Sequence, residues 1–227
     1  MKDWIIVSLG GSLIAPDAID TNFISQFADL LRRYCAGGYR FIVITGGGKT
    51  CRRYQAAAKE TNPNANIEDL DWVGIYATRL NGMLMRIVLK ELADSHMVTD
   101  PALFPQTDKP IVIGAGWEPG WSTDFDAVSL AHHVGAKTIV NLSNIDHVYD
   151  SDPKINPNAV AYTNLSWEKY RSQIPGEWSP GLSTPFDPIA ALKAQGYEME
   201  VIIMNGDDLT QFDNFLSGKD FDGTRIH

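Results

Sequence analysis

Short apolar runs alternate with longer amphipathic segments at the start of the chain. Residues 4–7 and 41–44 are apolar and largely β-branched, which is typical of buried strands, and each run is followed by glycines. Between them, apolar residues recur every three or four positions from a cap at Asp20 to a stop at Gly37, which predicts a helix. A second helix is predicted at about 49–59. This strand–helix–strand–helix order implies parallel strands joined by helical crossovers.

The same alternation continues over most of the chain. Residues 66–93 have helical periodicity over an unusual length, so we expect a break or bend near Gly74. Residues 150–188 are rich in proline, glycine and polar side chains, so we expect loops there, with one short helix around Trp167. The remaining pattern predicts strands at 96–99, 110–113, 138–142 and 201–204, and helices at 124–134, 188–194 and 209–216. The fold class expected from this pattern is α/β.

Composition narrows the class of ligand. A chain of 227 residues with 44% hydrophobic content can form one large α/β domain or two closely fused lobes. Its net charge of −9 argues against a nucleic-acid partner held on a broad basic surface. A small anionic ligand is compatible with that charge, because a few cations and backbone N–H groups can be focused locally.

Neither membrane insertion nor disulfide bonding is expected. The apolar run before Gly10 is too short for a secretory signal or a membrane span, and no later run is long enough. Cys35 and Cys51 have no metal-site or disulfide spacing. We therefore expect no membrane partner and a cytoplasmic protein.

Glycines at the ends of two predicted parallel strands are the most informative feature. Gly10-Gly11-Ser12 and Gly46-Gly47-Gly48 both lie beyond strand carboxyl ends, where ligands bind in such sheets. Backbone N–H groups of these loops can close on phosphate oxygens, and the helix beginning near Lys49 adds its positive end. The alternative is two tight turns without a ligand. Two clusters, one followed by Lys49, Arg52 and Arg53, favour anion binding.

Two familiar phosphate-binding motifs do not match these glycines. A P-loop ending at Gly48-Lys49-Thr50 requires a glycine where Val43 stands. A dinucleotide fingerprint beginning at Gly46 requires its last glycine at Cys51. The glycines therefore belong to another loop design.

Two further turns are candidates for ligand binding. The glycine-rich turn 114–124 leads from a predicted strand into a helix, and its polar end either only caps that helix or holds a second phosphate or a sugar. Asp124 and Asp126 in this place are also suited to orienting a metal or a cation. The acidic turn 141–153 is either a solvated loop or a pocket for a purine base and ribose, with Tyr149 as a packing surface.

Taken in order, six segments resemble the amino-acid-kinase superfamily. They are LGGS, TGGGK followed by two arginines, ATRLN, GWEPGWSTD, SNIDHVYDSDP and GTRI. Within the superfamily they are most similar to the compact archaeal-type branch of the UMP kinases, and the similarity spans residues 5–226. The resemblance implies a three-layer α/β/α sandwich with a central, mostly parallel sheet, formed as a single domain over 1–227. An acceptor-binding lobe is expected at about 1–135 and an ATP-binding lobe at about 136–227.

The resemblance also implies an activity and its partners. It implies transfer of the γ-phosphoryl group of MgATP to UMP, which gives ADP and UDP in pyrimidine nucleotide biosynthesis. The cofactor is then Mg²⁺, bound as MgATP, with no resident metal site. The expected assembly is a homo-hexamer built as a trimer of dimers. No general base is demanded, because the UMP phosphate attacks already ionised.

Roles for individual residues follow from the matched segments. The expected catalytic residues are Ser8, Gly10, Gly11, Ser12 and Lys49. Those that match ATP contacts are Ser8, Leu9, Gly10, Gly11, Ser12, Gly48, Arg52, Ser143, Asn144, Tyr149 and Asp152. Those that match UMP contacts are Gly47, Asp71 as the ribose carboxylate, and the loop Trp117, Glu118, Pro119, Gly120, Trp121, Ser122 and Thr123.

The chain departs from the family pattern at four positions. Ser8 stands where many members carry lysine, so the positive charge there falls to Lys49, Arg52 or magnesium. Tryptophans at 117 and 121 replace smaller or polar residues and can reshape the acceptor pocket. His147 replaces a glycine common in this loop, where a positive φ is often required.

These departures keep alternative functions open. One is a kinase for isopentenyl phosphate, carbamate or an acidic amino acid. The first of these is expected to place a histidine beside the acceptor phosphate, where this chain has Lys49-Thr50-Cys51. The other is a nucleotide-binding storage or regulatory protein on the same fold, which Ser8 and the tryptophan-rich loop suggest.

Overall fold

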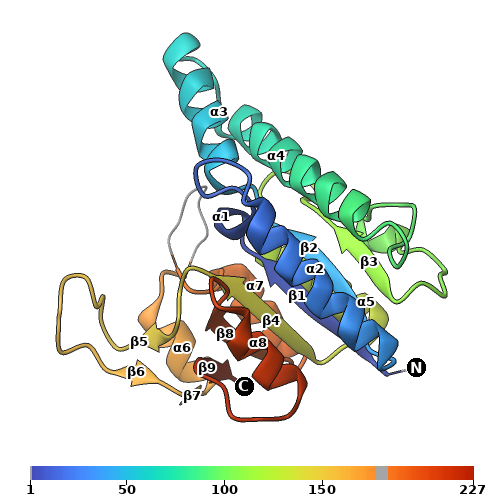
Figure 1. Cartoon of the computed structure of the whole chain (residues 1–227). Helices are drawn as coiled ribbons and strands as arrows, with labels where there is room; N and C mark the ends of the chain where they lie inside the picture. Colours follow the sequence, from blue (N-terminus) through green and yellow to red (C-terminus); the bar gives the residue numbers. More distant parts are fainter. Residues whose placement is uncertain (1, 177–183) are drawn as a thin grey trace.

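The computed structural model describes residues 2–176 and 184–227, and a seven-stranded sheet forms its middle layer (Figure 1). The strand order is β3-β2-β1-β4-β8-β9-β7. The strands are β1 (Trp4–Leu9), β2 (Arg40–Thr45), β3 (Ile111–Gly114), β4 (Thr138–Ser143), β7 (Asn164–Leu165), β8 (Glu200–Asn205) and β9 (Thr224–Ile226). Neighbours from β3 to β8 are parallel, β9 is antiparallel to β8, and β7 is parallel to β9. A separate antiparallel pair is formed by β5 (Val148–Tyr149) and β6 (Ala161–Tyr162).

Helices cover both faces of this sheet. They are α1 (Gly11–Ile14), α2 (Thr21–Ala36), α3 (Gly48–Thr61), α4 (Ile67–Val88), α5 (Thr123–Val134), α6 (Trp167–Gln173), α7 (Pro188–Gly196) and α8 (Leu209–Leu216), with a 3₁₀ turn η1 at Pro101–Leu103. Successive strand residues point to opposite faces, so Ile6 joins the core under α5, α6 and α7, whereas Val7 joins the core under α2 and α8. The three-layer α/β/α sandwich with a mostly parallel sheet is confirmed.

Helix α2 forms where the apolar periodicity predicted a helix, and its apolar face is buried. The side chain of Asp20 accepts a hydrogen bond of 2.9 Å from the backbone N–H of Phe23, which caps the helix as expected. Phe23, Phe27 and Leu31 lie on one face and are buried against the sheet. The chain leaves the helix at Gly37.

The expected break near Gly74 is wrong. Helix α4 is continuous from Ile67 to Val88 and passes through this glycine. A Cβ at Gly74 would lie 3.3 Å from Sγ of Cys51 and from Nε2 of Gln55, both on α3. The glycine therefore allows close packing of two helices rather than a bend.

The strand expected at 96–99 is also wrong. Val98 makes a single isolated bridge to Gly114 beside β3. The strands β5, β6, β7 and β9 and the short helix α1 were not predicted, because two to four residues are too few to show a periodicity. In the segment 150–188 the short helix around Trp167 is present as α6, while residues 177–183 lie outside the described part. Within residues 2–176 and 184–227, no helix is long and apolar enough to cross a membrane.

Candidate active site

The two glycine clusters touch each other at the carboxyl ends of β1 and β2. The backbone N–H of Gly46 donates a hydrogen bond of 2.9 Å to the carbonyl of Leu9. A Cβ on Gly11 would lie 2.1 Å from the backbone nitrogen of Gly48. Gly48 has a φ of +63°, and a Cβ there would lie 2.3 Å from the carbonyl oxygen of Gly11. Both positions therefore require glycine, and the loops form one continuous floor.

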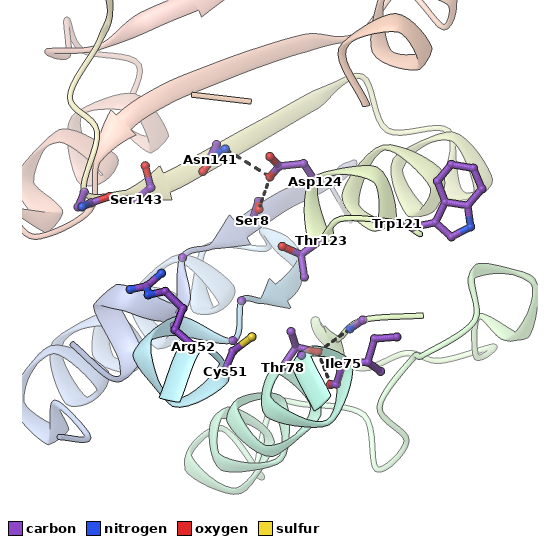
Figure 2. A pocket seen from close by; sticks show the side chains of 18 of the residues that line it. Ser8, Cys51, Arg52, Ile75, Thr78, Trp121, Thr123, Asp124, Asn141 and Ser143 are labelled. Carbon is purple, nitrogen blue, oxygen red and sulfur yellow. Dashed lines mark hydrogen bonds between the residues drawn. The ribbon is translucent and has the colours of Figure 1, made fainter. Parts of the chain in front are cut away.

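A pocket of about 450 Å³ lies over this floor (Figure 2). The loops after β1, β2 and β4, the start of α3, one face of α4 and the start of α5 all contribute to it. The residues assigned from sequence that line the pocket are Ser8, Gly10, Gly11, Gly47, Gly48, Arg52, Asp71, Trp121, Thr123, Ser143 and Asn144. Segments more than a hundred residues apart thus meet at one edge of the sheet, as the strand order requires.

Other residues line the same pocket without having been matched to an ATP or UMP contact. They are Gly46, Cys51, Gln55, Gly74, Ile75, Thr78, Gly116, Asp124, Asn141, Ile145, Thr184 and Pro185. Burial raises the pKa of the Cys51 thiol, which keeps it protonated at neutral pH. Gly46 and Asp124 belong to turns that were expected to bind a ligand, whereas most of the others are apolar or small, so their residue types carry no chemical signal.

Asp124 is the centre of a hydrogen-bond network on the floor of the pocket. Its Oδ1 accepts a hydrogen bond of 3.0 Å from the Ser8 hydroxyl, and the Asn141 amide donates to the same oxygen at 3.4 Å. Its Oδ2 accepts a hydrogen bond of 3.2 Å from the backbone N–H of Asp187. Burial and, to a smaller extent, the nearby charge of Asp187 together raise the pKa of Asp124 to about 7.

Asp187 is a second buried carboxylate that sequence reasoning missed. It is 4% exposed, and its Oδ1 accepts a hydrogen bond of 2.6 Å from Ala190 to cap α7. Burial raises its pKa as well. The only sequence signal was an Asp before Pro188, which is typical of a helix start and not of an active site.

Lys49 does not lie in this pocket. Its Nζ is 2.8 Å from Oδ1 of Asp17, and Arg53 donates to the Asp17 carbonyl at 2.8 Å. Arg52, one turn further along α3, lines the pocket instead. Of these two cationic residues, Arg52 lines the pocket and Lys49 does not.

The loop before α5 is held at both of its ends. Arg79 of α4 donates from Nε to the Gly116 carbonyl at 3.1 Å and from Nη2 to the Trp117 carbonyl at 2.9 Å. Asp71 accepts a hydrogen bond of 3.0 Å from the backbone N–H of Gly120 through Oδ2. Helix α4 thus sets the position of this loop from one side.

Asp126 holds the same loop from α5. Its Oδ2 accepts a hydrogen bond of 3.3 Å from the backbone N–H of Trp117. The side chain is 2% exposed, and its Oδ1 has no partner among the described residues. Burial raises the pKa of Asp126 to about 8, so the carboxyl is mostly neutral at pH 7.

Only some of the residues of this loop that were expected to contact UMP line the pocket. Trp121 lines it and stacks on Phe125, with ring centroids 4.1 Å apart and planes 12° apart. Its Nε1 donates a hydrogen bond of 3.2 Å to Glu118. The Ser122 hydroxyl caps α5 through Phe125. The members of the loop that do not line the pocket are Trp117, Glu118, Pro119, Gly120 and Ser122.

Four of the residues expected to contact ATP also do not line the pocket. Leu9 is fully buried in the core, so only its main chain faces the loops. Ser12 lines a separate cavity with Asp20 and Asn22. Tyr149 donates a hydrogen bond of 3.1 Å to Asp146, and Asp152 accepts one of 2.9 Å from the backbone N–H of Lys154. The residues Leu9, Ser12, Lys49, Tyr149 and Asp152 thus do not line the cavity described here.

His147 does not need the positive φ that a glycine allows. Among the described residues, Glu198 is the one non-glycine residue with a positive φ. The loop after β4 therefore accepts a side chain at 147 without backbone strain.

The mostly parallel sheet and the glycine floor at its carboxyl edge define a class of phosphate-binding α/β protein. The chain matches the amino acid kinase family over residues 3–205, and it belongs to that family. It is similar to the uridylate kinase of Thermococcus sibiricus, with 36% identity over 218 residues that cover 95% of this chain and 96% of the relative. It is also similar to the uridylate kinase of Pyrococcus abyssi, with 33% identity over 226 residues and 98% of each chain covered.

Comparison with a solved structure leads to the same family. The crystal structure of uridylate kinase from Archaeoglobus fulgidus has a TM-score of 0.83 to this chain at 29% identity, and the match covers 98% of this chain and 99% of that one. Within the amino acid kinase family, the chain therefore belongs with the uridylate kinases.

Proposed function

We propose that this protein is a UMP kinase, which transfers the γ-phosphoryl group of ATP to UMP and releases ADP and UDP. The observation that carries the proposal is the contact between the two glycine loops, Gly11 against Gly46–Gly48, beneath one pocket. Backbone N–H groups at such a floor suit a transferring phosphoryl group, which needs positioning and charge stabilisation more than covalent chemistry. The names of the similar proteins supply the nucleotide.

The donor is proposed to lie on the β4 side of the floor. Ser143, Asn144 and Ile145 line the pocket there. Arg52 and the N-terminal end of α3 face the phosphates, where a fixed positive charge lowers the energy of the equatorial oxygens. On this proposal the residues from about 136 to 227 form the ATP-binding lobe.

The acceptor is proposed to lie on the α4 side, in the lobe formed by residues 1 to about 135. Thr123 offers a hydroxyl at the N-terminal end of α5, which suits the UMP phosphate. Asp71 lines the pocket, and a carboxylate has enough lone pairs to bond Gly120 and a ribose hydroxyl together. Trp121, stacked on Phe125, offers a flat wall near the base.

Ser8 is proposed to position Asp124. A hydroxyl has one proton, and the Ser8 proton is directed at Oδ1 of Asp124, so the same group cannot also donate to a phosphate. Asp124 in turn receives donors from β4 and from the start of α7. The network therefore fixes the distance between the two sides of the pocket, which an in-line transfer requires.

Mg²⁺ is proposed to enter with ATP. Within residues 2–176 and 184–227 no three His, Cys, Asp or Glu side chains are grouped to hold a metal. The ion proposed here is held mainly by phosphate oxygens and water, with one or two carboxylates in support. Asp124 lines the pocket and is the carboxylate proposed for that support, and Mg²⁺ would neutralise charge on the β- and γ-phosphates.

The proposal includes a homo-oligomer, since one face of α4 is an uncovered apolar stripe. Its members are Trp72 (37% exposed), Tyr76 (64%), Leu80 (64%), Met83 (40%) and Ile87 (59%). The first turn of α4 is acidic, with Glu68 and Asp69, and the last turn carries Arg86. Antiparallel packing against a second copy covers the stripe and brings opposite charges together. We propose this α4 pair as the dimer of a hexameric, cytoplasmic enzyme.

A coupled assay for ADP release tests the function. Purified protein with MgATP is offered UMP, CMP, dUMP, AMP and isopentenyl phosphate, and we expect the highest kcat/KM with UMP. A different preferred acceptor would replace UMP in the proposal. Tight ATP binding without turnover on any acceptor would identify a storage or regulatory protein instead.

A further inference from the structure

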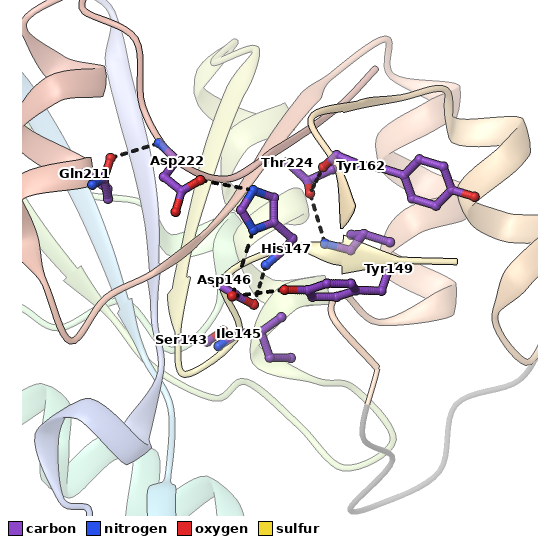
Figure 3. Close-up of polar contacts among 10 residues, drawn as sticks. Ser143, Ile145, Asp146, His147, Tyr149, Tyr162, Gln211, Asp222 and Thr224 are labelled. Carbon is purple, nitrogen blue, oxygen red and sulfur yellow. Dashed lines mark hydrogen bonds and ion pairs between the residues drawn. The ribbon is translucent and has the colours of Figure 1, made fainter. Parts of the chain in front are cut away.

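A buried histidine connects the donor side of the pocket to the C-terminal segment of the chain (Figure 3). His147 follows the pocket-lining residue Ile145 by two positions and is 9% exposed. Its Nε2 lies 3.4 Å from Oδ1 of Asp222, and its Nδ1 lies 4.0 Å from Oδ2 of Asp146. The imidazole therefore lies between two carboxylates from segments that are distant in sequence.

Asp146 links this histidine to the ring of Tyr149. Its Oδ1 accepts a hydrogen bond of 2.9 Å from the backbone N–H of His147, and its Oδ2 accepts one of 3.1 Å from the Tyr149 hydroxyl. The Tyr149 and His147 rings meet edge to face, with centroids 6.1 Å apart. A change at the imidazole thus reaches the tyrosine through the carboxylate they share.

The C-terminal side of the contact is firmly attached to the sheet. The backbone N–H of Asp222 donates a hydrogen bond of 2.8 Å to Gln211 of α8. Two residues later, the Thr224 hydroxyl oxygen accepts a hydrogen bond of 2.9 Å from the backbone N–H of Val148. Asp222 is therefore a fixed point against which the loop after β4 can be held.

We propose that His147 is a positioning residue for the donor nucleotide: it joins Asp146 to Asp222 and so holds the loop 143–149 in the geometry that binds ATP. The inference rests on the proposed function, because it takes Ser143–Ile145 as the donor side. An imidazolium has two N–H donors and can face both carboxylates, whereas a neutral imidazole has one donor and one acceptor.

A glycine at this position cannot make the contact. Without the imidazole, both Asp146 and Asp222 lose their contact to position 147. The groups that face His147 are Asp146 and Tyr149 from its own loop and Asp222 from the segment before β9.

The experiment measures both Michaelis constants and kcat for the variants His147→Gln and Asp222→Asn and for their double mutant, at pH 6 and pH 8. We expect each single change to raise KM for ATP about threefold to fivefold at pH 6, as for a partly exposed ion pair. KM for UMP and kcat stay within about twofold of the wild type. KM for ATP of the double mutant should be no higher than that of either single variant, because both substitutions remove the same contact.

A matched control is Asp220→Asn, which removes a carboxylate from the exposed neighbouring residue. An equal rise in KM for ATP in this control would mean a general charge effect and would overturn the inference. So would additive effects in the double mutant, an unchanged KM for ATP, or an equal rise in KM for UMP. Thermal unfolding verifies that each variant is folded, and the exposed Asp222 gives the same test if His147→Gln does not fold.

The outcome for the proposed function is separate. An active UMP kinase with an unchanged KM for ATP refutes only the role of His147. A wild type that binds ATP by calorimetry but transfers nothing to UMP refutes the proposed function, and the Kd for ATP of the same variants then decides the role of His147. A wild type that does not bind ATP refutes both.

Discussion

The hydroxyl of Ser8 donates a hydrogen bond of 3.0 Å to Oδ1 of Asp124 and so joins the end of β1 to the first turn of α5. This contact crosses the floor of the pocket, between the proposed donor and acceptor sides. The side chain at 8 thus organises a carboxylate and does not itself add positive charge.

Replacing Ser8 by alanine is expected to lower kcat about fivefold to twentyfold, because a hydrogen bond to a charged group contributes about 1.5 kcal/mol or slightly more. Ser8→Thr keeps the hydroxyl and should retain most of the activity. Steady-state kinetics at saturating ATP and UMP measure the effect. Equal kcat for Ser8→Ala and the wild type would show that Asp124 is held without this bond.

Gly11→Ala is expected to abolish activity and to lower stability, because its Cβ would lie 2.1 Å from the backbone nitrogen of Gly48. The loops must separate, which removes the phosphate floor; we expect kcat/KM to fall at least about a hundredfold, as for the loss of preorganised donors. Gly196→Ala is the matched control, since nothing lies within 4 Å of its added Cβ. Activity close to wild type in Gly11→Ala would contradict the proposed floor.

The glycine floor could be predicted from sequence because each part of it follows a recognisable buried strand. Parallel strands place their carboxyl ends at one edge, so glycines after residues 4–7 and 41–44 had to lie close together. The direction of Lys49 could not be predicted in this way. Its partner Asp17 lies 32 positions earlier, in a loop whose path depends on tertiary packing.

The carboxylate network was missed for a similar reason. Asn141 lies inside a strand and Asp187 before a helix, and each has an ordinary structural role in its own segment. Only the order β1-β4-β8 and the packing of α5 on α7 bring them to Asp124. A periodic pattern determines which face of an element is buried, but it does not determine which polar residues of different elements meet.

Asp126→Asn is expected to stabilise the protein at neutral and higher pH. The folded pKa of about 8 lies above the ordinary value of 3.8, so the folded state binds the proton more tightly and wild-type stability falls as pH rises between these values. Asparagine keeps the acceptor for Trp117 without a charge. The difference in the free energy of unfolding between Asp126→Asn and the wild type should increase from about pH 4 by at most about 1.4 kcal/mol per pH unit. It should become constant above about pH 8.

Urea unfolding at pH 5, 7 and 9 measures this difference. Asp100→Asn is not a suitable control, because the side chain of Asp100 caps η1. Asp220→Asn removes an exposed charge without such a role and is used instead. Asp220→Asn should show no comparable pH dependence. A gain for Asp126→Asn that is the same at pH 5 and pH 9 would mean that burial of the charge is not its source.

Asp71→Asn is expected to raise KM for UMP about tenfold while KM for ATP stays within about twofold. The substitution weakens a hydrogen bond between a charged carboxylate and the UMP ribose, and it changes nothing on the ATP side of the pocket. The same change weakens the contact to Gly120, so the loop before α5 becomes less well placed. Glu60→Gln, which removes an exposed carboxylate from the last turn of α3, is the matched control and should leave both constants unchanged. A parallel rise in both constants would place Asp71 outside the acceptor side.

Leu80→Asp is expected to separate the proposed dimer into single chains, because a carboxylate at the centre of the α4 stripe cannot be buried without a partner. Light scattering coupled to gel filtration measures the mass. Leu103→Asp is the matched control: this residue is 76% exposed on η1, away from α4, and its change should leave the assembly intact. Equal mass for wild type and Leu80→Asp would refute the α4 interface.

The same variant also connects assembly to catalysis. The opposite face of α4 carries Asp71, Ile75 and Thr78 of the pocket, and Arg79 holds the carbonyls of the loop before α5. A helix packed on both faces keeps these groups in place, whereas a helix with one apolar face in water has fewer contacts to hold it. Dissociation by Leu80→Asp should therefore raise KM for UMP more than KM for ATP. A monomeric variant with both constants unchanged would show that the acceptor side is complete within one chain.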